Sequence, residues 1–136
     1  MLRYFHKTGL ENVYSRNWKM CFATRAAAGA MGFDLLVKNP KEASAATTAV
    51  MAEGSFTSKI RDRFGMTISG GQDALKGKIV RIGHMGFIDA WDVQNQLMAV
   101  GLVAKELGKS VNLDAGMKAY FDVISSKENL TPDDLR

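Results

Sequence analysis

The order of the expected helices and strands is what most constrains the fold of this chain. Four stretches have the apolar, β-branched composition of strands, and they come in two neighbouring pairs, residues 33–38 with 47–52 and residues 66–69 with 78–84. The patterns before, between and after the pairs predict helices, at residues 9–31, at residues 55–64, after Asp89 and from about Leu113. Strands that come in pairs favour antiparallel contacts over the parallel sheet of a strictly alternating chain. We therefore expect an α+β domain with a long N-terminal helix, in which helices cover a small, mostly antiparallel sheet of three to four strands.

Capping residues mark the expected ends of these helices. Short polar side chains can accept hydrogen bonds from the first turn of a helix, and glycine is favoured just past the last turn. The candidate starts and stops are Gly29, Gly32, Ser55, Gly65 and Asp89, and Thr131 with Pro132 could begin a short terminal helix. Beyond Asp89, apolar residues recur every three or four positions and predict one buried helix face, made of Val93, Leu97, Val100, Ala104 and Leu107.

Composition narrows the class of protein. The 136 residues suit one domain, and 46% hydrophobic with 24% charged residues is typical of a globular chain. A single cysteine, Cys21, excludes an internal disulfide and a four-thiolate zinc site, and we expect it to be a reduced thiol in the core. No stretch reaches the roughly 18 consecutive apolar residues of a membrane span. Residues 1–7 lack the apolar region of a signal peptide, so we expect a cytoplasmic protein with no membrane partner.

The segment from Ser69 to Gly86 is the densest in candidate site residues. It contains five glycines but neither a Walker A loop nor a dinucleotide-binding fingerprint, so its Gly-Gly pair is by default a turn. Arg81 lies inside an apolar strand and is a candidate ligand for a carboxylate or a phosphate. The alternatives are that it faces solvent or pairs with an internal acid. For His84, a structural role in the core is favoured over that of a base or a metal ligand.

A basic cluster raises the question of nucleic-acid binding. The formal net charge is +4, and basic residues are frequent in two short stretches, at Lys59, Arg61, Arg63, Lys76 and Lys78. Acidic residues are interspersed among them, aromatic residues do not alternate with them, and no RNA-binding motif is present. We therefore interpret the cluster as a solvated surface and expect no nucleic-acid partner.

Several of these segments resemble one known family. Gly70-Gly71-Gln72, Leu75-Lys76-Gly77-Lys78-Ile79 and Arg81-Ile82-Gly83-His84-Met85-Gly86 resemble the C-terminal part of class V aminotransferases, most of all the alanine–glyoxylate and serine–pyruvate (serine–glyoxylate) branch. Proteins named as the small subunit of a soluble hydrogenase share this resemblance, although one cysteine offers no nickel or iron–sulfur site here. The likeness covers nearly the whole chain to about Ser125, through Gly9–Val13, Arg16, Thr48–Val50, Phe64–Ile68 and Leu107–Ala119.

The resemblance implies a fold-type I enzyme that depends on pyridoxal phosphate (PLP). In such an enzyme Arg81 would hold the carboxylate of a small amino acid, alanine or serine, or of a 2-oxo acid such as glyoxylate or pyruvate. The lysine that binds PLP lies in the family's larger N-terminal domain, which this sequence does not contain. We therefore expect residues 1–136 to be the small domain alone, inactive and without bound cofactor. Its partners would be the large domain, packed on an exposed apolar face, and a second subunit in a homodimer. The alternative is a stand-alone α+β module that binds a small carboxylate or regulates without catalysis.

Overall fold

The computed structural model describes residues 2–128 and 130, and within them it contains an α+β fold. Its helices are α1 (Leu2–Thr8), α2 (Leu10–Met31), α3 (Phe56–Phe64), α4 (Ala90–Glu106) and α5 (Leu113–Ile124). Its strands are β1 (Thr47–Met51), β2 (Ser69–Gly70) and β3 (Ile79–Gly83). They form one antiparallel sheet in the order β1-β3-β2. The expected fold class is therefore confirmed, while the helix expected at Thr131 lies outside the described residues.

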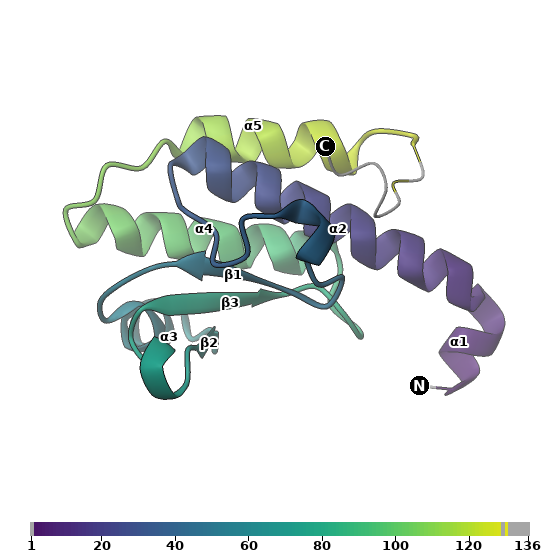
Figure 1. Cartoon of the computed structure of the whole chain (residues 1–136), viewed down its shortest axis with the longest axis horizontal. Coiled ribbons are helices and arrows are strands. Elements are labelled where there is room, and N and C mark those ends of the chain that lie inside the picture. Colours follow the sequence, from purple (N-terminus) through teal and green to yellow (C-terminus); the bar gives the residue numbers. More distant parts are fainter. Residues whose placement is uncertain (1, 129, 131–136) are drawn as a thin grey trace.

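The molecule has two layers, a helical layer and the sheet (Figure 1). Helices α2, α4 and α5 pack against one another on one side of the sheet, and α3 lies beside α4. The core lies between the layers, where Val50, Val80 and Ile82 of the sheet meet the apolar face of α4. The predicted face of α4 is confirmed for Val93, Leu97, Val100 and Ala104, which are buried. The fifth predicted residue, Leu107, lies just past the end of α4 and is only partly buried against the core.

The long helix α2 ends where the glycine pattern predicts. Gly32 has a φ of 96°, in the left-handed region that favours glycine, and closes the helix, whereas Gly29 lies inside it. A second glycine, Gly9, has a φ of 82° and separates α2 from the short helix α1, which the sequence pattern did not predict. Cys21 is completely buried in α2, as expected for a core thiol, and burial raises its pKa.

Two of the four expected strands are wrong in extent. Residues 33–38 form only an isolated bridge between Leu35 and Val50, because the side chain of Arg25 donates to the carbonyls of Val37 and Lys38 at 3.0 and 3.2 Å. Those carbonyls are then not free for a strand partner. The strand expected at residues 66–69 is reduced to Ser69–Gly70. The two remaining strands, β1 and β3, are confirmed to within one residue at each end.

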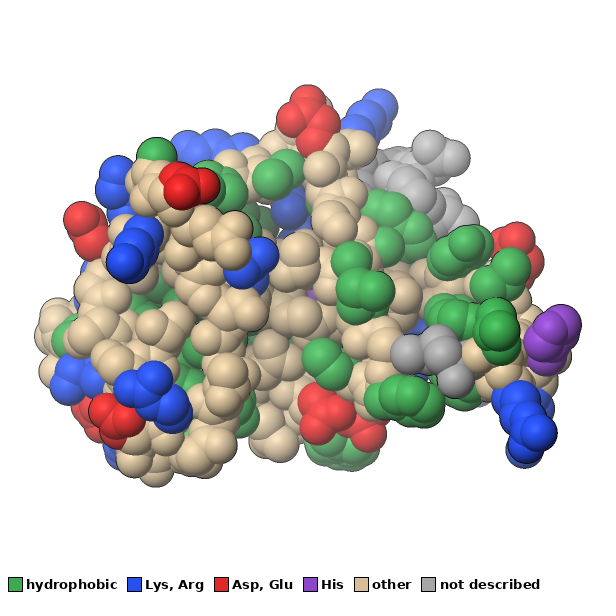
Figure 2. All heavy atoms as spheres, turned by 90° about the horizontal axis from the view of Figure 1, so that it is seen from below, with side chains coloured by type: hydrophobic (Ala, Val, Ile, Leu, Met, Phe, Trp, Pro, Cys, Tyr) green, Lys and Arg blue, Asp and Glu red, His purple; other side chains and the backbone are tan. Residues whose placement is uncertain are grey.

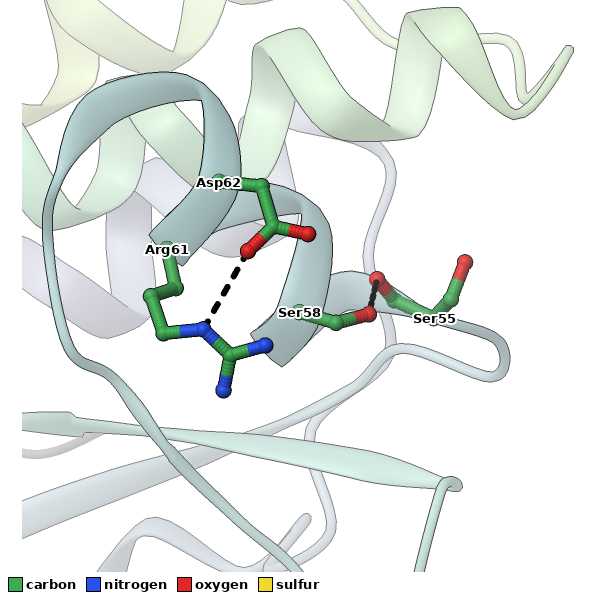
Figure 3. Close-up of polar contacts among 4 residues, drawn as sticks. All are labelled: Ser55, Ser58, Arg61 and Asp62. Atoms are coloured by element: carbon green, nitrogen blue, oxygen red, sulfur yellow. Dashed lines mark hydrogen bonds and ion pairs between the residues drawn. The ribbon is translucent and has the colours of Figure 1, made fainter.

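Of the two N-cap residues predicted within the described part of the chain, Asp89 forms a side-chain cap and Ser55 does not. Asp89 accepts hydrogen bonds from the backbone of α4, and Asp92 returns one to the backbone N–H of Asp89, which completes a capping box. Ser55 does precede α3, but its side chain makes no capping bond. Instead its carbonyl accepts a hydrogen bond from the hydroxyl of Ser58 at 3.1 Å (Figure 3). Its φ of −83° and ψ of 41° are not the extended conformation that aims an N-cap side chain at the first turn.

Candidate functional site

Arg81 lies in the middle of β3, the central strand of the sheet. It pairs with Ala49 of β1 on one side and with Ser69 of β2 on the other. Its neighbours Val80 and Ile82 are buried against the helices, so the alternation of the strand places Arg81 on the opposite face, where it is half-buried.

The guanidinium of Arg81 is held at one end. Its Nε donates a hydrogen bond to the carbonyl of Gly70 at 2.9 Å, across the ladder between β2 and β3. None of the ion pairs within the described part of the chain involves Arg81, so pairing with an internal acid is not seen. A guanidinium fixed through Nε still carries two terminal nitrogens, which are the fork that matches a carboxylate.

Arg81 borders an open hollow of about 250 Å³. Its lining comes from the strands, the residues before β2, the loop before α4 and α4 itself, and consists of Thr47, Thr67, Ile68, Ser69, Arg81, Gly83, Ile88 and Gln96. One positive charge among neutral polar and aliphatic side chains suits a small ligand with a single negative group. A second hollow of about 330 Å³ shares Thr67, Ile88 and Gln96 with the first.

The Gly-Gly pair has a steric function beyond that of an ordinary turn. A Cβ atom on Gly71 would lie 2.0 Å from the carbonyl oxygen of Leu75, and one on Gly70 would lie 3.2 Å from Cγ2 of Thr57. Any side chain at position 71 would therefore push against backbone. Glycine there lets the loop close tightly behind β2, beside the carbonyl of Gly70 that receives Arg81.

His84 has a structural role, as the sequence analysis favoured. It is completely buried, with Nδ1 2.8 Å from the carbonyl of Ala45 and Nε2 3.0 Å from the hydroxyl of Thr48. A carbonyl can only accept, so Nδ1 carries the proton and Nε2 accepts from Thr48. Burial lowers the pKa of His84, which favours this neutral form. No group of three or more potential metal ligands occurs among residues 2–128 and 130.

Two members of the basic cluster are paired with acids. On α3, Arg61 lies 3.2 Å from the carboxylate of Asp62, and both side chains are mostly exposed (Figure 3). Arg63 forms an ion pair with Glu106 at the end of α4. These exposed pairs are consistent with a solvated surface, where ion pairs contribute little to stability.

Gln96 is the site residue that the sequence did not indicate. Its side chain lines the hollow and forms two hydrogen bonds with Gly83, both 3.1 Å long. The available signal was weak, since Gln96 is simply a polar residue next to the apolar face of α4. Its contact with β3 depends on how helix and sheet pack.

An apolar surface lies at the end of the molecule formed by α1. This α1 surface consists of the exposed side chains of Leu2, Leu10 and Phe87 with the half-buried rings of Tyr4 and Phe5, and Figure 2 shows hydrophobic side chains gathered at that end. The rings of Tyr4 and Phe87 lie 5.9 Å apart, which connects α1 to the loop after β3. Helix α1 itself contains no buried residue. Within the described residues, no helix is both long and apolar enough to cross a membrane.

Comparison with known proteins gives consistent relatives, although no family model matches the chain. The chain is 38% identical over 125 residues to the soluble hydrogenase 42 kDa subunit of Anabaena cylindrica, covering 88% of this chain and 32% of that protein. It is 31% identical over 134 residues to a serine–glyoxylate aminotransferase of Hyphomicrobium methylovorum, covering 91% of this chain and 33% of that enzyme.

The solved structures agree with these relatives. The pyridoxamine–pyruvate aminotransferase of Mesorhizobium loti superposes with a TM-score of 0.87 at 28% identity, over 93% of this chain and 34% of that one. The chain thus spans about a third of the length of the curated relatives it matches. The expected resemblance is confirmed: the homologues and structural neighbours of this chain are class V aminotransferases, and the part of them that it matches is their small domain.

Proposed function

We propose that this chain is the small domain of a PLP-dependent aminotransferase and that Arg81 binds the carboxylate of its substrates. The substrates would be a small amino acid, alanine or serine, and a 2-oxo acid such as glyoxylate or pyruvate. The observation that carries the proposal is a half-buried arginine on the central strand, fixed at Nε and bordering a hollow without a competing carboxylate. We also propose that the assembled enzyme is a cytoplasmic homodimer.

Arg81 would orient the substrate. Two parallel hydrogen bonds from the terminal nitrogens fix both the position and the rotation of a carboxylate, which a single ammonium group does not achieve. Holding one end of a small substrate in this way presents its amino or keto group in a fixed direction, so that orientation need not be found during the reaction. The aliphatic side chains of Ile68 and Ile88 reduce access of water to the charged pair.

The cofactor does not fit among the lining residues of this hollow. PLP is held as a Schiff base with a lysine, and when bound it supplies the electron sink for transamination. None of the eight lining residues is a lysine. In our proposal the lysine comes from a large domain, and this chain alone neither binds PLP nor transaminates.

We propose that the large domain packs on the α1 surface. The matched relatives are about three times as long as the segment they share with this chain. A helix of seven residues without buried side chains has little stability of its own, so α1 needs a partner surface. The exposed phenyl ring of Phe87, 75% accessible, extends the same apolar area.

Titration of the chain with pyruvate tests the role of Arg81. Pyruvate is expected to shift the NMR signal of the backbone amide of Ser69, which lines the hollow and is present in every variant below, with a dissociation constant in the millimolar range, whereas the uncharged analogue pyruvamide should leave it in place. Arg81→Ala should abolish binding, and Arg81→Lys should weaken it about tenfold because the two-point contact is lost. Arg61→Ala on α3 is the matched control. A wild-type affinity in Arg81→Ala, or a wild-type chain that ignores pyruvate, would overturn the assignment.

The second candidate function is a stand-alone module that binds a small carboxylate without catalysis. It is favoured by the hollow itself, because Arg81, the one charged lining residue, is already held at Nε by Gly70 of the same chain. An antibody raised against the chain distinguishes the two in extracts of the source cells. A band far above 14.9 kDa supports the aminotransferase domain, and a band at 14.9 kDa supports the module.

A further inference from the structure

The side chain of Gln96 forms a two-point contact with the backbone of Gly83. Its Oε1 accepts from the N–H of Gly83 at 3.1 Å, and its Nε2 donates to the carbonyl of Gly83, also at 3.1 Å. The backbone N–H can only donate and the carbonyl can only accept, so the orientation of the carboxamide is fixed. The side chain thus makes the same two hydrogen bonds that a paired residue of a neighbouring antiparallel strand would make.

The contact replaces a strand that has ended. In the register of β2 with β3, Ser69 lies opposite Arg81, so an extended β2 would place Thr67 opposite Gly83. Instead β2 begins only at Ser69, and the outward backbone groups of Gly83 would have no strand partner. Backbone groups in a partly buried position need a partner, and Gln96 reaches from α4 to supply both bonds.

The same contact lies beside the guanidinium of Arg81. Gly83 is two residues after Arg81 on the same face of β3, and Arg81, Gly83 and Gln96 all line the hollow. The guanidinium is therefore held on the β2 side through Gly70, and the strand that carries it is held just beyond through Gln96.

We propose that Gln96 is a positioning residue for the carboxylate site. By completing the edge of β3 at Gly83, it fixes the strand from which Arg81 projects and closes the wall of the hollow next to the guanidinium. This inference rests on the proposed role of Arg81. The affinity for a carboxylate would then depend on Gln96, although the carboxamide of Gln96 bonds the backbone of Gly83 and not the ligand.

The test is the pyruvate titration of the folded chain, at a temperature well below unfolding. Gln96→Met keeps the length of the side chain and removes both hydrogen bonds, and we expect it to weaken pyruvate binding about tenfold. The matched control is Gln94→Met on the same helix, because the side-chain oxygen of Gln94 is buried without a hydrogen-bond partner among the described residues. It should bind as the wild type does. The Nε–H signal of Arg81 should move in Gln96→Met even without ligand.

Gln96→Glu provides a second readout that a purely structural role would not produce. The ionised carboxylate cannot donate to the carbonyl of Gly83 and places a negative charge beside the ligand, so binding at pH 7 should be weaker than in Gln96→Met. Protonation restores a donor and an acceptor, and binding should recover as the pH falls towards the usual range of a glutamate carboxyl. This variant also provides the answer if Gln96→Met does not fold.

The outcomes separate the two proposals. Wild-type affinity in a folded Gln96→Met, or pH-independent binding in Gln96→Glu, overturns the role of Gln96 while Arg81→Ala still shows whether the site exists. Wild-type affinity in Arg81→Ala overturns the proposed function itself.

Discussion

At the scale of single residues, Arg81 and His84 are three positions apart in sequence but lie on opposite sides of the sheet. Arg81 and Gly83 border the hollow, whereas His84 follows Val80 and Ile82 to the buried side. The two residues therefore do not form an acid–base pair. Arg81 provides an accessible positive charge, whereas His84 is a neutral, hydrogen-bonded side chain that packs in the core.

The buried His84 makes stability depend on pH. Burial lowers its pKa in the folded state below the ordinary value of 6.5, so the unfolded chain takes up a proton more readily. The stabilising contribution is complete above that value and is lost as the pH falls below it. Urea unfolding of the wild type between pH 7 and pH 5 should show the loss, with a slope from this group of at most about 1.4 kcal/mol per pH unit.

Replacement of each histidine identifies the source of that slope. His84→Gln removes the titrating group and should be less stable at pH 7 but have a smaller change between pH 7 and pH 5. The comparison variant is His6→Gln, which replaces the exposed histidine of α1 and leaves His84 in place. An unchanged slope in His84→Gln would contradict this explanation.

Of the two residues proposed for the site, the sequence could indicate Arg81 but not Gln96. Arg81 was identifiable as a candidate because a charged residue inside an apolar strand is conspicuous, and the structure places it at the hollow. Gln96 was not identifiable, because its contact with Gly83 depends on the rotation of α4 against β3. The spacing of residues along one helix does not determine how that helix is rotated against the sheet.

At the scale of secondary-structure elements, the helical layer depends on close contacts at glycine. A Cβ atom on Gly116 of α5 would lie 2.2 Å from Cγ of Met31, and Met31 is only 1% exposed. On α4, a Cβ atom on Gly101 would lie 2.3 Å from a methyl group of Leu113. These glycines let α2, α4 and α5 approach closely.

Two alanine substitutions should therefore have opposite effects on stability. Gly116→Ala is expected to destabilise by about 1–3 kcal/mol, because the buried side chain of Met31 must move within a packed core. Gly29→Ala, at an exposed position of α2 with no atom within 4 Å of the added Cβ, should stabilise by about 0.5–1 kcal/mol through helix propensity. Chemical unfolding of both variants beside the wild type measures the difference. Equal effects would show that packing at Gly116 is not limiting.

Elements were predictable where local pattern decides them. Asp89 caps α4 and Gly32 ends α2 through their own side-chain and backbone chemistry, and both were expected. The expected strand at 33–38 shortened because the side chain of Arg25 bonds the carbonyls of residues 37–38. The strand expected at 66–69 begins only at Ser69, and Gln96 of α4 bonds Gly83 where a longer β2 would have paired. Such competition is tertiary and has no local pattern.

At the scale of the whole molecule, the two ends differ in how well their apolar side chains are covered. The sheet and the helices α2, α4 and α5 enclose a continuous core, so the chain can fold around it. The α1 surface, in contrast, exposes Leu2 at 76% and Phe87 at 75% and has no covering element within the described residues. A free apolar area of this kind favours association.

The isolated chain is therefore expected to self-associate through the α1 surface. Phe87→Ser should weaken the association constant at least about tenfold, since burial of a phenylalanine side chain contributes about 1.5–3 kcal/mol. Sedimentation equilibrium over a range of concentrations measures the constant. Because Phe87 is exposed, the free energy of unfolding of the monomer should change by less than about 0.5 kcal/mol.

A matched change at the opposite end tests whether the effect is specific to this surface. Phe64 ends α3, which lies far from α1 (Figure 1), and its side chain is 38% exposed beside Arg63. Phe64→Ser removes the same group from a surface that the proposal leaves free, so association should stay at the wild-type level. Equal weakening by both variants would indicate non-specific hydrophobic contact. Weakening by Phe87→Ser alone would show that the chain associates through the α1 surface.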